Sequence, residues 1–396
     1  MKKTLSILLT ISFLANISAQ VDFYSVNKKN SNYRFTEAKQ IAGTNVKNQG
    51  STGTCWSFSM QSFLESEIMR NRKTNAIEKP LDFAEMWTAR NAYFDKAVKY
   101  VRMQGKTNFG QGGEPHDVIS MSKKYGIVPQ DVYTALAKDQ KKYDHNEIEA
   151  VLKAYCDALV KHVTDGKPLS RNWQAGIDGI LDAYMGAKPN EFEVDGKKYT
   201  PKTYSASLGI DLNDYIEVSS FTHHPYYSQF VIEIPDNWSD DMVYNVPLTD
   251  LETIADNALA NNYGLEWASD VSEKYFSFKN GLAILTEKNW ADMTQPEKDS
   301  TFLNPVKQMT AITPEFRQEA FDNQTTQDDH GMHIVGSAKD QLGQKYYLVK
   351  NSWGTEGNEM GGYFYVSKAY FLYKTTGIMV NKKAVPKEIA KKMGII

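Results

Sequence analysis

The residues most able to do chemistry begin with a cysteine at the junction between a glycine-containing loop and an amphipathic helix. Cys55 follows residues 49–54, which read QGSTGT, and apolar residues recur after it at helical spacing. Those apolar positions are Trp56, Met60, Phe63, Leu64 and Ile68. A thiol at a helix N-terminus, with Thr54 as N-cap, lies beside N–H groups that favour negative charge. The pattern predicts a nucleophilic cysteine biased toward the thiolate.

A nucleophilic thiol needs a base, a group that orients the base, and donors for an oxyanion. His330 precedes one apolar run and Asn351 follows a second, so we expect both at strand ends. Gln49 lies six residues before Cys55 and can place its side-chain amide beside the helix N-terminus as an oxyanion donor. Cysteine, histidine and asparagine in this chain order form a known catalytic triad.

These stretches resemble the papain-like cysteine peptidases. Residues 49–59 resemble the nucleophile loop of that family, and residues 351–354, NSWG, resemble its asparagine motif. The resemblance implies an α+β papain-like fold of two lobes, in which a helical lobe carries the nucleophile helix and an antiparallel β lobe carries the histidine and asparagine. It also implies hydrolysis of peptide bonds through a thioester, with no metal or organic cofactor.

The choice of base lies between His330 and His333. In the family the base precedes a small and apolar run ending in Val-Gly, and His330 matches that length through Val335 and Gly336. Residues three apart on a strand point to opposite faces, so both histidines cannot face Cys55. We expect His333 to be a packed strand histidine. A metal site of Asp329, His330 and His333 is the less favoured alternative.

Two further features are interpreted through the same resemblance. A Gly-Gly pair lines the substrate cleft in the family, which implies that Gly112 and Gly113 contact the substrate backbone. A plain turn is the alternative. Trp353 is expected to shield the bond between His330 and Asn351 from water, a role compatible with simple core packing.

Cys156, the second of two cysteines, is expected to be a small buried residue in a helix rather than a disulfide partner.

The start of the chain reads as an export signal. Residues 1–19 have two lysines, an apolar stretch and a small-residue ending, and that stretch is too short to span a membrane. No later stretch supplies a membrane span. The protein is therefore expected to be exported, either periplasmic or secreted. Removal of the two lysines changes the net charge from −3 to −5, which argues against nucleic acid as principal partner. Residues 20–44 form a polar arm, too short for an inhibitory helical pro-domain, although a short removable arm is possible.

The catalytic domain is expected to span residues 45–380 and to contain a large insertion. His330 lies 275 residues after Cys55 (330 minus 55), against roughly 130–150 in the papain pattern. An insertion of about 130 residues is therefore expected near residues 135–300, mainly helical and decorating the core. One of its helices should open with a capping box at residues 249–252. One face of that helix comprises Leu251, Ile254, Ala255, Ala258 and Leu259.

The insertion narrows the resemblance to the bleomycin hydrolase and bacterial aminopeptidase C branch. Residues 125–129, YGIVP, and 224–226, HPY, also resemble that branch. The branch implies an aminopeptidase, a homo-hexameric ring, and a C-terminal tail in the cleft; here the tail, residues 381–396, could equally be a surface helix. Peptides are the expected substrates. The alternatives are an endopeptidase with the same chemistry and a papain-fold protein that binds peptides without turnover.

Overall fold

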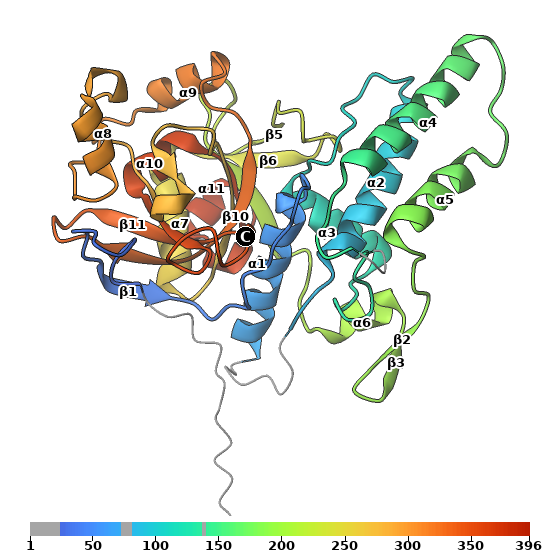
Figure 1. Ribbon diagram of the computed structural model, residues 1–396, viewed down its shortest axis with the longest axis horizontal. Helices are drawn as coiled ribbons and strands as arrows, with labels where there is room; N and C mark the ends of the chain where they lie inside the picture. Colours follow the sequence, from blue (N-terminus) through green and yellow to red (C-terminus); the bar gives the residue numbers. More distant parts are fainter. Residues whose placement is uncertain (1–23, 73–80, 137–139) are drawn as a thin grey trace, which may run out of the picture.

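The computed structural model describes residues 24–72, 81–136 and 140–396. A large sheet with its own helices forms one half of the molecule, and a group of helices forms the other (Figure 1). Helix α1 (Cys55–Asn71) runs between the two halves and is buried over most of its length. Because α1 contacts both halves, its first residue lies where they meet.

The helical half is built from amphipathic segments whose apolar residues share one core with α1. Its elements are α2 (Glu85–Arg102), α3 (Pro115–Tyr125), α4 (Asn146–Thr164), α5 (Trp173–Met185), α6 (Pro201–Ser207) and the hairpin of β2 (Phe192–Val194) and β3 (Lys197–Tyr199). Helix α3 starts at a proline in its first turn and ends at Gly126, whose φ of 82° suits glycine. Cys156 is fully buried in α4 and both cysteines are free thiols, as expected from the sequence.

The other half is organised around a mixed, mostly antiparallel sheet. Its strands are β1 (Thr36–Gln40), β4 (Tyr215–Ser219), β5 (Gln229–Val231), β6 (Met242–Asn245), β7 (Leu265–Ser269), β8 (Phe276–Ser277), β9 (Leu282–Ala283), β10 (His330–Lys339), β11 (Lys345–Lys350), β12 (Tyr363–Ser367) and β13 (Thr375–Asn381). They follow the order β5-β6-β4-β13-β7-β10-β11-β12-β9-β8, and β1 also pairs with β10. The predicted α+β class is thus observed.

The two faces of the sheet bury different partners because side chains alternate along each strand. On β10, His333 faces α1, whereas Met332 and Ile334 pack in the core on the opposite face. That opposite face is covered by α7 (Leu248–Ala260), α10 (Lys368–Lys374) and α11 (Lys387–Lys392). Helices α8 (Gln295–Thr301) and α9 (Pro314–Asp322) lie further out on this half (Figure 1).

The region near 135–300 contributes to both halves. Helices α4 to α6 and the small hairpin belong to the helical half, but β4 to β9 and α7 belong to the sheet half. Strand β7 lies between β13 and β10, and all five of its residues are buried. This part of the chain is therefore central to the sheet and not a decoration on its surface.

Both ends of the described chain are packed into the sheet half. Tyr33 and Phe35 are buried in the N-terminal arm, and β1 extends the sheet through β10, so the arm is an integral part of the fold. At the other end Ile389 and Met393 pack from the tail onto the α7 side of the sheet. The predicted signal peptide, residues 1–19, lies outside the described residues. None of the described helices is long and apolar enough to cross a membrane.

Candidate active site

Cys55 is the first residue of α1 and is partly exposed. Thr54 occupies the N-cap position, as predicted, but its side chain makes no capping bond, and its hydroxyl lies 2.6 Å from that of Thr52. The backbone groups of Gly331 and Trp56 lower the pKa of the Cys55 thiol, against the larger opposite effect of burial. Because Gly331 follows His330 in the chain, the thiol lies against the start of β10.

His330 and Asn351 come together at the ends of adjacent strands. The Nε2 atom of His330 lies 2.7 Å from the Oδ1 atom of Asn351. The same oxygen accepts the backbone N–H of Ser352 at 2.8 Å, which identifies it as the carbonyl oxygen of the amide. His330 must therefore donate its Nε2 proton, and a neutral imidazole then keeps its lone pair on Nδ1. A base in this tautomer can accept a proton from a thiol.

Trp353 covers this histidine. Its ring stacks on the His330 ring with the centroids 4.6 Å apart and an interplanar angle of 28°. The rings of Phe276 and Phe278 pack against Trp353 at nearly right angles. His330 and Asn351 are both buried as a result. The arrangement fits the predicted shielding role of Trp353 and also packs it in the core.

Gln49 is fixed by hydrogen bonds of its side chain and its backbone next to the start of α1. Its Oε1 atom accepts the hydroxyl of Ser352 at 2.6 Å, and its Nε2 atom donates to the carbonyl of Thr52 at 2.6 Å. Its backbone N–H donates to the carbonyl of Ser352 at 2.8 Å. One Nε2 proton remains for another acceptor, so the amide can act beside the N–H of Cys55, which has no acceptor within its own helix.

The Gly112–Gly113 stretch lies beside this N-terminal turn, but part of it is already covered. The indole N–H of Trp56 donates to the carbonyl of Gln111 at 3.1 Å, which ties the stretch to α1. A Cβ atom on Gly112 would overlap the carboxyl group of Asp236. A Cβ atom on Gly113 would lie only 3.0 Å from the Trp56 ring. The approach to Gly112 is therefore occupied by a carboxylate from the inserted region.

Asp236 belongs to a group of acidic side chains near the thiol. Asp236 and Asp328 both act on Cys55 electrostatically and raise its pKa. Asp328 accepts the hydroxyl of Thr376 at 2.6 Å, and burial raises its pKa to about 7. Burial also raises the pKa of the neighbouring Glu114 well above its usual value. No local motif in the sequence indicates this group, because its carboxylates come from distant segments of the chain.

The protonation of the two reacting groups depends on their burial. Burial raises the pKa of the Cys55 thiol to about 12, and the nearby carboxylates add to the shift. Burial also lowers the pKa of His330 to about 4, against a smaller opposite effect of the Asn351 hydrogen bond. Burial of the thiol therefore opposes the bias toward thiolate that the helix N-terminus predicts. Burial thus favours the uncharged form of both side chains.

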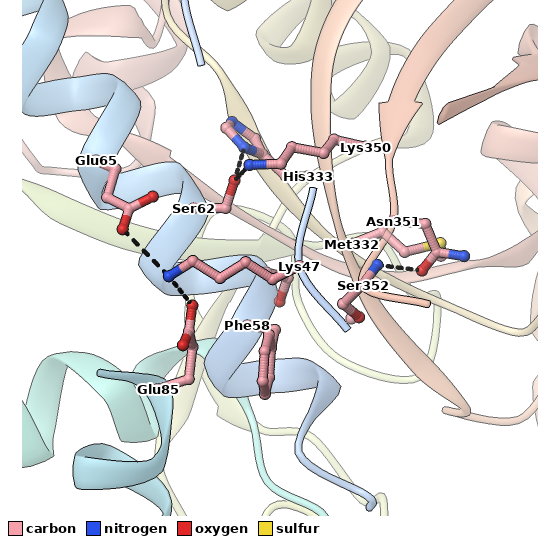
Figure 2. Close-up of a pocket in the computed structure, with 12 residues that line it drawn as sticks. Lys47, Phe58, Ser62, Glu65, Glu85, Met332, His333, Lys350, Asn351 and Ser352 are labelled. Atoms are coloured by element: carbon pink, nitrogen blue, oxygen red, sulfur yellow. Dashed lines mark hydrogen bonds and ion pairs between the residues drawn. The ribbon is translucent and has the colours of Figure 1, made fainter. Parts of the chain in front are cut away.

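His333 belongs to a separate cluster of polar side chains, which includes Ser62 of α1. Figure 2 shows Lys350 donating to the hydroxyl of Ser62, which is also bonded to His333. The distances are 2.8 Å from Lys350 Nζ to Ser62 Oγ and 2.9 Å from Ser62 Oγ to His333 Nδ1. Lys47 approaches Glu65 and Glu85 in the same cavity. His333 is thus a packed strand histidine with a hydroxyl partner.

The alternative metal site at residues 329–333 is not formed. Asp329 accepts the backbone N–H of Ser272 at 2.9 Å, while His330 bonds Asn351 and His333 bonds Ser62. The three side chains turn to three separate partners and share no common point. They cannot act together as metal ligands in this conformation.

Comparisons with known proteins support a papain-like fold and cysteine peptidase chemistry. The model of the Peptidase C1-like family matches residues 11–394. Aminopeptidase G of Lactobacillus delbrueckii subsp. lactis is 23% identical over 88% of this chain and 83% of its own length. Aminopeptidase W of the same organism is 24% identical over 87% of this chain and 82% of its own length. Cysteine proteinase 1, mitochondrial, of Saccharomyces cerevisiae is 22% identical over 92% of this chain and 80% of its own length.

One solved structure has the same fold. PepW from Lactobacillus rhamnosis aligns with a TM-score of 0.68 at 19% identity, covering 90% of this chain and 84% of PepW. The predicted papain-like fold and the resemblance to the aminopeptidase branch are confirmed by these matches. With nearly the whole chain matched by the family model, this protein belongs to the Peptidase C1-like family of cysteine peptidases.

Proposed function

We propose that the protein is a cysteine aminopeptidase that removes amino-terminal residues from peptides by acyl transfer to Cys55. The family and the names of the relatives support peptidase chemistry. The aminopeptidase assignment rests on one observation: the Asp236 carboxylate lies against Gly112, beside the turn that holds Cys55. We infer both the catalytic mechanism and the substrate specificity from the side chains of this site.

In the first step Cys55 attacks the scissile carbonyl while its proton moves to Nδ1 of His330. Formation of the two charges together adds their mutual attraction, about 4 kcal/mol for unit charges about 4 Å apart at an effective dielectric of 20. Asn351 holds the imidazolium through Nε2. The free proton of the Gln49 amide and the N–H of Cys55 stabilise the oxyanion, contributions worth roughly 3–4 kcal/mol per donor in other enzymes.

Collapse of the tetrahedral species expels the amine of the shortened peptide, which takes the proton from His330 and leaves a thioester on Cys55. Water then attacks the thioester and gives its proton to His330. The released amino acid leaves with a carboxylate, and the thiol regains its proton. The cycle needs no group beyond the side chains already described.

Specificity for the amino-terminal residue follows from Asp236. A peptide that extended beyond that residue would need the space next to Gly112, which the carboxyl group fills. A free ammonium group can instead pair with that carboxylate and with Asp328. We assign this role to Asp236 and not to the C-terminal tail, whose Ile389 and Met393 pack on the α7 side of the sheet.

The test is a comparison of Asp236→Asn with Asp240→Asn on a matched pair of peptides, one free and one acetylated at the amino terminus. Asp240 lies in the same segment but is exposed and paired with Lys99. Asp236→Asn should lose at least tenfold in kcat/KM on the free peptide, while Asp240→Asn keeps its activity. Equal activity of wild type and Asp236→Asn on the free peptide would refute the assigned role.

Export is part of the proposal and rests on residues 1–19 of the sequence. The basic start, the apolar stretch and the small residues before Gln20 are typical of a cleaved signal. Fractionation of cells with N-terminal sequencing of the mature chain tests it. Recovery of the intact chain, starting at Met1, from the cytoplasm would contradict it.

A further inference from the structure

Two consecutive histidines and a glutamate converge at one edge of the sheet, away from Cys55. His223 and His224 lie in the loop after β4, and Glu233 follows β5. The Nε2 atom of His223 lies 3.1 Å from one Glu233 carboxylate oxygen, and that of His224 lies 3.2 Å from the other. Within the described ranges, this is the one group of three such side chains whose ligand atoms all lie within 4.8 Å of one another.

The tautomer of His223 is fixed by its neighbours. Gln318 accepts the backbone N–H of Thr222 at 2.7 Å through Oε1 and donates to Asp322 at 2.8 Å through Nε2. Because Oε1 is an acceptor, the Nδ1 atom of His223, 3.1 Å from it, must be the donor. A neutral His223 then directs the lone pair of Nε2 at a Glu233 oxygen. Two acceptors 3.1 Å apart require a proton or a metal cation between them.

A metal cation satisfies the whole group better than protons do. The rings of His223 and His224 have their centroids 4.3 Å apart. Two imidazolium charges at about that distance repel each other. One divalent cation is bound by both lone pairs and the carboxylate at once. Separations of 3.1–3.2 Å are close to the roughly 3.3 Å between ligands around tetrahedral zinc.

The rings are also held in place before any ligand arrives. The ring of His224 stacks on Phe230 at 4.5 Å, and that of His223 stacks on Phe321 at 6.1 Å. The amide of Asn245 donates to the backbone carbonyl of His224 at 2.8 Å and fixes the loop. A ligating histidine whose other ring nitrogen donates to a fixed acceptor, as His223 does to Gln318, is the usual outer-shell arrangement of a metal site.

We propose that His223, His224 and Glu233 bind one Zn²⁺ ion, through two imidazole Nε2 atoms and the carboxylate, with water as the fourth ligand. The ion would clamp the loop after β4 to the segment after β5. It takes no part in the peptidase reaction, and the site stands apart from the proposed function. Ligands of this type also accept Co²⁺, which serves as a spectroscopic probe.

The test uses the mature chain with Cys55→Ala, because the thiol and His330 could themselves bind zinc. Zn²⁺ is titrated by calorimetry and Co²⁺ by visible absorption, in the parent and in added variants. Glu233→Gln and His224→Ala remove ligands, and His162→Ala removes an exposed histidine elsewhere as a matched control. Thermal melts confirm that each variant is folded.

The parent should bind one equivalent of Zn²⁺ and show the visible bands of tetrahedral Co²⁺. Glu233→Gln and His224→Ala should weaken binding at least tenfold and abolish those bands, whereas His162→Ala should match the parent. Absence of saturable binding in the parent would overturn the proposal and leave a histidine–glutamate ion pair. Binding that survives Glu233→Gln with unchanged affinity would overturn it as well.

Discussion

Replacement of Asn351 by alanine should slow catalysis by a predictable amount. The change removes the acceptor 2.7 Å from His330 Nε2, in a place where both residues are buried and Trp353 excludes water. An unpaired buried N–H costs about 1–3 kcal/mol, and more when the ring carries charge. With a tenfold change in rate for each 1.36 kcal/mol, kcat/KM should fall roughly 5- to 160-fold.

Asn351→Asp is the matched control because it keeps the acceptor and adds a charge. Burial sets the pKa of His330 at about 4, so the neutral base is lost as the pH falls through 4. A carboxylate this close should raise that pKa by about 1–3 units. The acid limb of the kcat/KM profile should therefore move upward by the same amount. An alanine variant that is folded and within twofold of wild type, or an unmoved limb in the aspartate variant, would refute the reasoning.

Three further predictions concern groups around the site and the arm. Burial raises the pKa of Asp328 to about 7, so this carboxyl group is charged only above that pH. For peptides with a free amino terminus, kcat/KM should therefore rise as the pH passes 7, and Asp328→Asn should flatten this rise. Acetylated peptides serve as the control. His333→Ala should retain activity within a few-fold, since its partner is Ser62; a loss equal to that of a His330 variant would contradict this. Phe35→Ala should destabilise the fold by about 3–5 kcal/mol in urea unfolding, because the ring is buried and stacks on Tyr365 at 3.8 Å; an unchanged midpoint would show that the arm is dispensable.

Local helical patterns in the sequence were reliable guides to the fold. The predicted face of α7 is buried as expected, although the helix begins at Leu248 with Pro247 as N-cap, ahead of the capping box expected at Thr249. The apolar stripe of α1 is also buried. The burial of its polar face was not predicted. Ser62 and Glu65 are satisfied by partners on β11 and in the arm, which only the folded chain brings near.

Features that depend on contacts between distant segments could not be predicted from the sequence, for the same reason. Tyr33 and Phe35 alternate as in a strand, but the segment is too short and polar to reveal its place in the sheet. The central position of β7 depends on pairing with β10 and β13, far apart in the chain. Its five residues are buried on both faces, so the periodicity of a half-exposed strand is absent.

The same contrast between local motifs and long-range contacts holds for the candidate active site. Local motifs single out Cys55, His330 and Asn351, and the structure places the side chains of His330 and Asn351 2.7 Å apart, while their catalytic roles stay a prediction. Asp236 was missed because its contact with Gly112 joins two loops without a shared motif. The effect of burial on Cys55 was also not predicted, since a helix N-terminus can be recognised in a sequence and desolvation cannot.

Aminopeptidase activity is tested most directly by hydrolysis of a matched pair of fluorogenic peptides, free and acetylated at the amino terminus, by the mature chain and by Cys55→Ala. We expect wild type to cleave the free peptide at least a hundredfold faster than the acetylated one and Cys55→Ala to cleave neither. Comparable cleavage of both peptides by wild type would contradict the aminopeptidase assignment. Activity that persists in Cys55→Ala would contradict the proposed chemistry itself.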